Sequence, residues 1–140
     1  MERILIPVDG SANAERAVAY VIAMIGKGRA VEVHLVNVQP PLRENVARFI
    51  ARGEIEGYHR EEGEKALAGA KQRLADAGIA ATSHIGVGPA GETIADFAKE
   101  LGADGIVMGT RGLGGLAGLL LGSVATEVIR EAKVPVTLVK

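Results

Sequence analysis

Five short apolar segments alternate with four longer segments whose apolar residues recur at helical spacing. Continuous apolar runs of this length are typical of strands buried on both faces. Strands that alternate with helices form a parallel sheet through right-handed crossovers. We therefore expect an α/β fold in one domain over residues 1–140, a doubly wound parallel sheet with helices on both faces. The expected strands cover 3–9, 29–41, 79–88, 104–110 and 134–140, and the expected helices cover 10–28, 54–77, 89–103 and 123–133.

Two segments depart from this regular pattern, residues 42–53 and the glycine-containing helix predicted over 54–77. Residues 42–53 show no clean period, which predicts a surface excursion with a short helix. Three glycines, Gly57, Gly63 and Gly69, each weaken the helix predicted over 54–77 by about 1 kcal/mol relative to alanine, so its first half is expected to fray.

Composition narrows the function classes. The net charge is −1 and aromatic residues make up 3% of the chain, so neither a global positive field nor a base-stacking surface favours nucleic acid. The chain contains no cysteine, which excludes disulfides, thiolate metal sites and cysteine nucleophiles and is compatible with a reducing compartment. The N-terminal residues lack the features of a signal peptide, and no apolar stretch approaches the roughly 20 residues of a membrane span. We expect a soluble, cytoplasmic protein.

A glycine-rich stretch, "GTRGLGGLAGLLLGS", follows the fourth predicted strand. In doubly wound sheets, ligands bind beyond the carboxyl ends of the strands, where the strand order reverses. The first strand is expected to end at Asp9 and the fourth at Gly109, and if these strands are neighbours both ends face one crevice. Gly122 and Ser123 open a helix, whose free N–H groups and dipole suit a phosphate. The stretch therefore favours a backbone cradle for an anion.

Simpler interpretations of the same residues stay open. Asp9 could cap the first helix, the glycines could form a plain connector, and the leucines at 119–121 could belong to the core. "GVGPAG" (86–91) matches a dinucleotide fingerprint, but the next acid, Asp104, starts the following strand instead of ending it. The three histidines show no spacing typical of a metal site and are interpreted as strand and surface residues.

The spacing Gly109-x2-Gly112-x9-Gly122-Ser123 resembles the G-2x-G-9x-G-[S/T] signature of the ATP-binding universal stress proteins. "IPVDGS" after the first strand and "VPVTLVK" at the end are similar to that family as well. The resemblance covers essentially the whole chain. It implies the strand order 3-2-1-4-5 of a Rossmann-like, adenine nucleotide alpha-hydrolase-like fold, with a nucleotide between strands one and four.

The resemblance also implies which residues hold the nucleotide. The adenosine would lie against the end of the first strand and the main chain at the end of the second, the ribose and phosphates along the fourth strand and its loop, and the last phosphate at the final helix. In that order the residues are Pro7, Val8, Asp9, Val38, Met108, Gly109, Arg111, Gly112, Gly122, Ser123 and Val124.

The function implied is that of a small regulatory protein that binds ATP with Mg²⁺ or Mn²⁺. The cation is expected to be held by the phosphates, without protein ligands. We find no catalytic residues, so hydrolysis is expected to be slow at most. Arg111 is the only cation of the loop, so ADP or AMP can compete. The alternatives are a nucleotide-free dimeric interaction module of the same fold and an AMP or ADP sensor.

The last predicted strand, 134–140, is expected to pair with the same strand of a second copy of the chain. It is apolar and β-branched, and it lies at a sheet edge that nothing else in the pattern covers. A two-fold axis could pair two such strands antiparallel, and the family resemblance implies the same homodimer.

Overall fold

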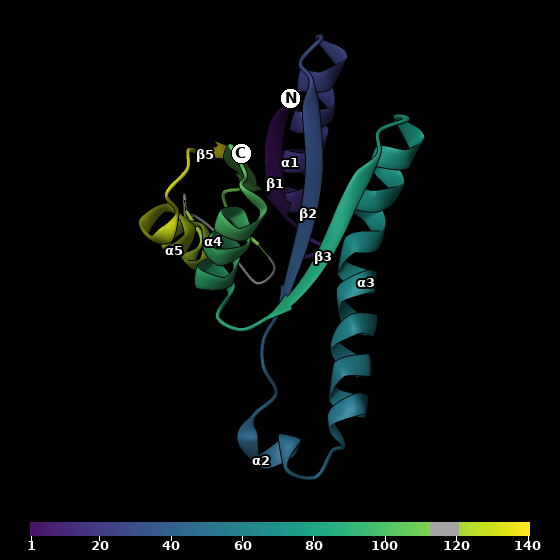
Figure 1. Cartoon of the computed structure of the whole chain (residues 1–140), viewed down its shortest axis with the longest axis vertical. Helices are drawn as coiled ribbons and strands as arrows, with labels where there is room; N and C mark the ends of the chain where they lie inside the picture. Colours follow the sequence, from purple (N-terminus) through teal and green to yellow (C-terminus); the bar gives the residue numbers. More distant parts are fainter. Residues whose placement is uncertain (113–120) are drawn as a thin grey trace.

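The computed structural model describes residues 1–112 and 121–140, which form a five-stranded sheet of order β3-β2-β1-β4-β5 (Figure 1). All neighbouring strands in this sheet are parallel, which confirms the predicted fold class and the strand order. The strands are β1 (Glu2–Pro7), β2 (Val31–Gln39), β3 (Ala81–Val87), β4 (Gly105–Gly109) and β5 (Val136–Val139).

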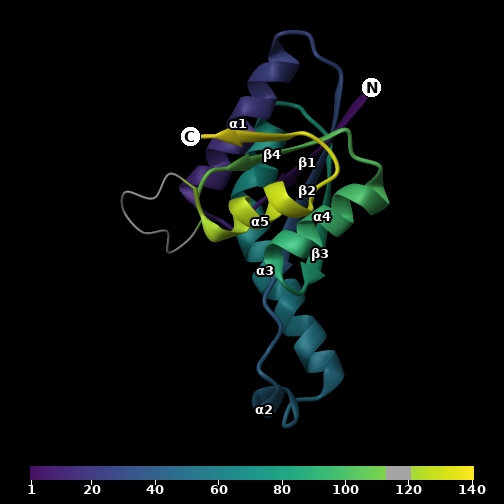
Figure 2. The same ribbon diagram turned by 90° about the vertical axis from the view of Figure 1, so that its left-hand side faces the viewer.

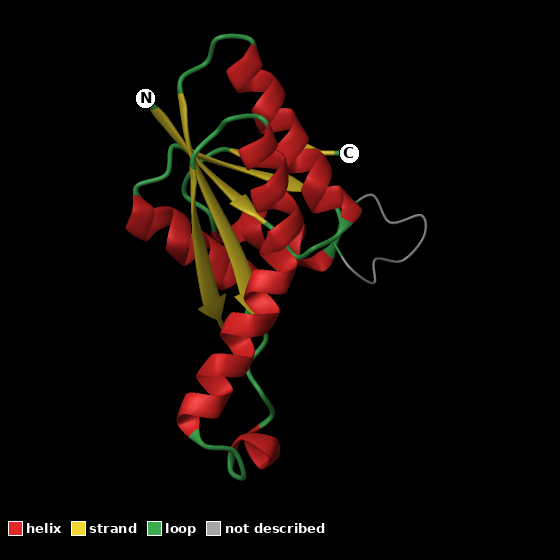
Figure 3. Cartoon of the chain, turned by 90° about the vertical axis from the view of Figure 1, so that its right-hand side faces the viewer, coloured by secondary structure: helices red, strands yellow, loops and turns green. Residues whose placement is uncertain are grey.

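Helices cover both faces of the sheet (Figures 2 and 3). The residues of α1 and α3 pack with one face, and those of α4 and α5 pack with the other. Ser11 caps α1 as predicted, because its hydroxyl accepts the Ala14 N–H at 3.2 Å. The helices are α1 (Ala12–Gly26), α2 (Glu44–Ala47), α3 (Arg52–Asp76), α4 (Ala90–Leu101) and α5 (Ser123–Glu131).

The central strands contribute side chains to two separate cores, because successive residues of a strand point to opposite faces. Ile4 and Ile6 of β1 pack with α1 and α3, whereas Leu5 packs with α4 and α5. All three are at most 3% exposed, which explains why the β1 segment is apolar without alternation. β3 lies at an edge of the sheet, as its poorer apolar content predicts.

The strand order reverses between β1 and β4. From β1 the chain continues to β2 and β3 on one side, and β4 and β5 lie on the other side. Ile4 is opposite Gly105 and Pro7 is opposite Val36, so the carboxyl ends of β1, β2 and β4 open at the same edge. A crevice at this reversal point is where open α/β sheets bind ligands.

Several ends of the observed elements differ by a few residues from the predicted ends, and two differences affect the site or the packing. Regular pairing of β1 ends at Pro7, two residues before the predicted end at Asp9. The third helix starts at Arg52 and is continuous to Asp76, whereas we expected its first half to fray. The short helix expected in 42–53 is α2, and together with the first half of α3 it extends beyond the end of the sheet (Figure 1).

No helix of the described residues has both the length and the apolar composition of a membrane span.

Candidate functional site

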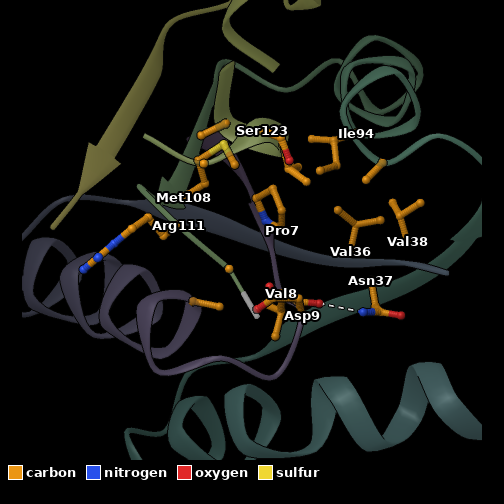
Figure 4. Close-up of a pocket in the computed structure, with 17 residues that line it drawn as sticks. Pro7, Val8, Asp9, Val36, Asn37, Val38, Ile94, Met108, Arg111 and Ser123 are labelled. Atoms are coloured by element: carbon orange, nitrogen blue, oxygen red, sulfur yellow. Dashed lines mark hydrogen bonds between the residues drawn. The ribbon is translucent and has the colours of Figure 1, made fainter. Parts of the chain in front are cut away.

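A cavity of about 370 Å³ opens at the carboxyl ends of β1, β2 and β4 and reaches the first turn of α5 (Figure 4). Every residue that the sequence predicts for a nucleotide site lines it. These residues are Pro7, Val8, Asp9, Val38, Met108, Gly109, Arg111, Gly112, Gly122, Ser123 and Val124. The fold therefore brings together, around one cavity, residues from Pro7 to Val124, which are 117 positions apart in the chain.

The cavity also has walls that the sequence reasoning missed, namely Ala14, Val36, Asn37, Ala90, Ile94 and Ala125. Val36 could have been found, because it shares a strand face with Val38 two residues later. Ile94 lies on the buried stripe of α4. Asn37 has no local signal, because its place in the site depends on where the pairing of β1 ends.

The chain leaves β1 through a series of hydrogen bonds that fix its direction. The Val8 N–H donates to the Val36 carbonyl at 2.8 Å, and the Val8 carbonyl accepts from Asn37 Nδ2 at 2.8 Å. One residue later, Asp9 Oδ1 accepts the Ser11 N–H at 2.9 Å. Ser11, not Asp9, makes the side-chain cap of α1, so capping does not account for Asp9.

Two glycines bring the loop after β4 against these residues. A Cβ on Gly112 would overlap Asp9 Oδ2, and a Cβ on Gly109 would lie 2.8 Å from the Asn13 carbonyl oxygen. At Gly109 the neighbour is main chain, so the approach is closer than a side chain allows, whereas at Gly112 a side chain would displace the Asp9 carboxylate. The glycines of the motif therefore do more than connect two elements, because they let the β4 loop touch the end of β1 and the start of α1.

The far end of the cavity is the N-terminus of α5. Gly122 is its N-cap, and the Gly122 N–H closes the loop by donating to the Thr110 carbonyl at 2.6 Å. The N–H groups of the first turn of a helix have no intrahelical partners and carry the positive end of its dipole. Ser123 and Val124 of this turn are exposed and line the cavity, which gives it an anion-binding end.

The charge in the described lining is sparse. Asp9 is half-buried, and Arg111 is half-buried with its guanidinium directed away from Ser123 (Figure 4). Residues 113–120, which include Leu119 and Leu120 of the predicted loop interior, lie outside the described residues. Leu121 packs against the core on the α4 and α5 face.

A pair of histidines lies on the α4 side of the sheet, away from the cavity lining. His34 Nδ1 and His84 Nε2 are 3.0 Å apart, and His34 Nε2 is 2.9 Å from Glu32 Oε2, which also pairs with Arg3. Burial, together with the nearby His34, lowers the pKa of His84. Hydrogen bonds from His34 and Arg3 hold the pKa of Glu32 below its usual range.

His34 and His84 lie on strands, as the sequence predicts, but their contact was not expected. His59 was interpreted as a surface or strand residue, and it is buried on α3 instead. The register of β2 and β3 places His34 opposite Thr82 and Val36 opposite His84, so the imidazoles meet diagonally across neighbouring strands. Within the described residues, no group of three or more histidine, aspartate or glutamate side chains is arranged to hold a metal ion.

Comparison with known proteins gives a consistent result. The model of the "Universal stress protein family" matches residues 1–140. Universal stress protein MJ0531 of Methanocaldococcus jannaschii is 36% identical over 99% of this chain and 82% of its own length. The solved structure of MJ0577 from the same organism has a TM-score of 0.82 and 34% identity, covering 99% of this chain and 95% of that one.

Solved relatives contain bound nucleotides, cAMP in one and dAMP in another. The universal stress protein from Archaeoglobus fulgidus in complex with dAMP has a TM-score of 0.72 and 26% identity. The comparison covers 100% of this chain and 98% of that one. An adenine nucleotide is therefore bound by a protein that is similar to this chain from end to end.

Proposed function

Since the chain belongs to the universal stress protein family, we propose that it is a regulatory protein that binds an adenine nucleotide in the cavity between β1 and β4. One observation carries the proposal above the others. The residues of the Gly109-x2-Gly112-x9-Gly122-Ser123 motif line the same cavity as Pro7, Val8 and Asp9, at the reversal point of the sheet. The dAMP complex of the relative supports the ligand class.

We assign the two ends of the cavity to the two ends of the nucleotide. The base and ribose lie among Val36, Val38 and Ile94 and within reach of the Asp9 carboxylate, which can accept from a ribose hydroxyl or the base amine. The phosphates lie at the first turn of α5, where main-chain N–H groups and the Ser123 hydroxyl donate. This division follows the polarity of the lining, which is apolar near β2 and α4 and rich in donors at α5.

We propose ATP as the first ligand, with ADP and AMP as competitors. The direction of Arg111, away from Ser123, favours the competitors, because no described side-chain cation then faces the phosphates. A Mg²⁺ or Mn²⁺ ion fits as a companion of the phosphates, since Asp9 is the one carboxylate among the described lining residues. These residues offer no general base beyond Asp9, which we assign to binding, so any hydrolysis is slow.

We further propose that two copies assemble through β5 and that the protein works in the cytoplasm. β5 pairs with β4 on one side and forms an edge of the sheet on the other. Its open edge carries the main-chain groups of Val136 and Leu138, because those of Thr137 and Val139 point toward β4 in this register. Unpaired edges of this kind invite a second strand.

Mass spectrometry of the small molecules released from the purified, denatured protein tests the ligand class. We expect an adenine nucleotide to be released, and its phosphate count to distinguish ATP from ADP and AMP. Release of a chemically different ligand in stoichiometric amount would contradict the assignment.

A further inference from the structure

The main-chain hydrogen bonds between β1 and β2 are followed, at the end of β1, by one hydrogen bond from the Asn37 side chain. The last regular pair is Pro7 with Val36, and the Val8 N–H then donates to the Val36 carbonyl at 2.8 Å. In a continuing parallel ladder, the Val8 carbonyl would accept the next main-chain donor, the Val38 N–H. It accepts instead from the Asn37 side chain, whose Nδ2 is 2.8 Å away (Figure 4).

The neighbouring groups determine the orientation of this amide. The Val8 carbonyl can only accept, so Asn37 must present its Nδ2 there, and its Oδ1 accepts from Gln39 Nε2 at 2.7 Å. Asn37 is 4% exposed. Burial of an amide costs free energy unless its hydrogen bonds are made, and here both ends of the amide have a partner.

Packing alone does not explain an asparagine at this position. Val33 and Leu35 point to the same face of β2 and belong to the apolar core there. An apolar side chain at 37 would continue that pattern without any polar group to satisfy. The amide occurs in the part of β2 that lines the cavity, between Val36 and Val38, and it contacts the turn into Asp9.

We propose that Asn37 is the positioning residue of the nucleotide site, an inference that rests on the proposed nucleotide binding. Its side chain holds the Val8 carbonyl, and through it the turn that sets the Asp9 carboxylate against Gly112. By taking the place of the Val38 N–H, it leaves the Val38 main chain for the base. Gln39 orients the amide for this task.

The test compares nucleotide affinity with stability in matched variants. Asn37→Leu keeps the approximate shape and removes the donor, and we expect it to weaken ATP and AMP binding roughly ten- to a hundredfold. Val33→Ala, on the same face of the same strand, lowers the melting temperature but leaves the dissociation constant unchanged. Combined with Asp9→Ala, Asn37→Leu should add less than its effect alone, because the two act through one turn.

A second variant keeps the proposal testable if Asn37→Leu does not fold. Gln39→Met leaves Asn37 in place and removes its orienting donor, so we expect a several-fold loss of affinity. If the wild type binds nucleotide and the Asn37 and Gln39 variants bind within twofold of it, the positioning role is wrong while the proposed function stands. If the wild type binds no adenine nucleotide, both fall together.

Discussion

At the scale of single residues, Asp9 and Ser11 divide two tasks that the sequence alone cannot separate. Both follow β1, and either is a good helix N-cap by type. In the structure the Ser11 hydroxyl accepts the Ala14 N–H, whereas the Asp9 carboxylate accepts the Ser11 N–H and lines the cavity. Ser11 therefore belongs to the helix and Asp9 to the site.

This division predicts opposite effects of two alanine substitutions. Asp9→Ala should weaken adenine nucleotide binding by about 1–3 kcal/mol, because a charged hydrogen bond is lost, with little change in melting temperature. Ser11→Ala should lower stability by about 1 kcal/mol and leave the affinity nearly unchanged. Calorimetric titration and thermal unfolding of both variants check the pair, and the reverse assignment of effects would refute it.

A side chain introduced at Gly112 would clash with a different kind of group from one introduced at Gly109. At Gly112 the obstacle is the end of the Asp9 side chain, which can move, whereas at Gly109 it includes the main chain of Asn13. Gly112→Val should therefore abolish nucleotide binding while the protein stays folded. Gly109→Val should also lower the melting temperature. Unchanged nucleotide affinity in Gly112→Val would contradict the proposed contact of this loop with the ligand.

At the scale of elements, the pairing of β2 with β3 creates a pH-sensitive contact. His84 lies against His34 and 5.7 Å from the Phe97 ring, measured between centroids, and its pKa is lowered by burial and by His34. A histidine whose pKa is lower when folded is protonated more readily in the unfolded chain. Folding stability must then fall as the pH decreases through the histidine's unfolded pKa of about 6.5.

We expect the melting temperature to fall between pH 7.5 and pH 5.5. The lowered pKa of Glu32 adds to the loss of stability only at lower pH, below the carboxyl group's ordinary value of 4.5, where acid protonates the carboxylate. His84→Phe should flatten the fall relative to the wild type, since the phenyl ring fills the space without binding a proton. Equal slopes for the two proteins would show that this pair does not control the response.

At the scale of the whole molecule, the fold was more predictable than the details of its strands. Alternating elements and right-handed crossovers leave few arrangements, and the glycine spacing indicated which strand ends meet. The end of β1 was misplaced because the side chain of Asn37, on another strand, ends the ladder at Pro7. The contact between His34 and His84 was not predicted, because it depends on the pairing register of β2 with β3. Neither strand's sequence determines that register by itself.

The persistence of α3 has a similar cause. Glycines weaken an isolated helix, but Gly63 faces β3, where a Cβ would lie 2.7 Å from the Ile85 side chain. Gly63 is unfavourable for the helix by local propensity, but its lack of a side chain lets the helix pack closely on β3.

Assembly is also a property of the whole molecule, and the structure indicates where to test it. Val136 and Leu138 pack against the core, so charges there would disturb the fold as well as a dimer. Thr137 is exposed in the middle of β5. Thr137→Glu should convert a dimer to a monomer in light scattering without lowering the melting temperature, because like charges meet near the two-fold axis. A wild type that is monomeric at high micromolar concentration would refute assembly through β5.

The central claim is that the cavity between β1 and β4 binds an adenine nucleotide, and isothermal titration calorimetry tests it most directly. Wild-type protein, from micromolar to millimolar concentration, is titrated with Mg-ATP, ADP and AMP, and Gly112→Val serves as the matched control. We predict saturable heat with one nucleotide per chain for the wild type and none for the variant. Absence of heat with all three nucleotides, or equal binding by the variant, would contradict the account.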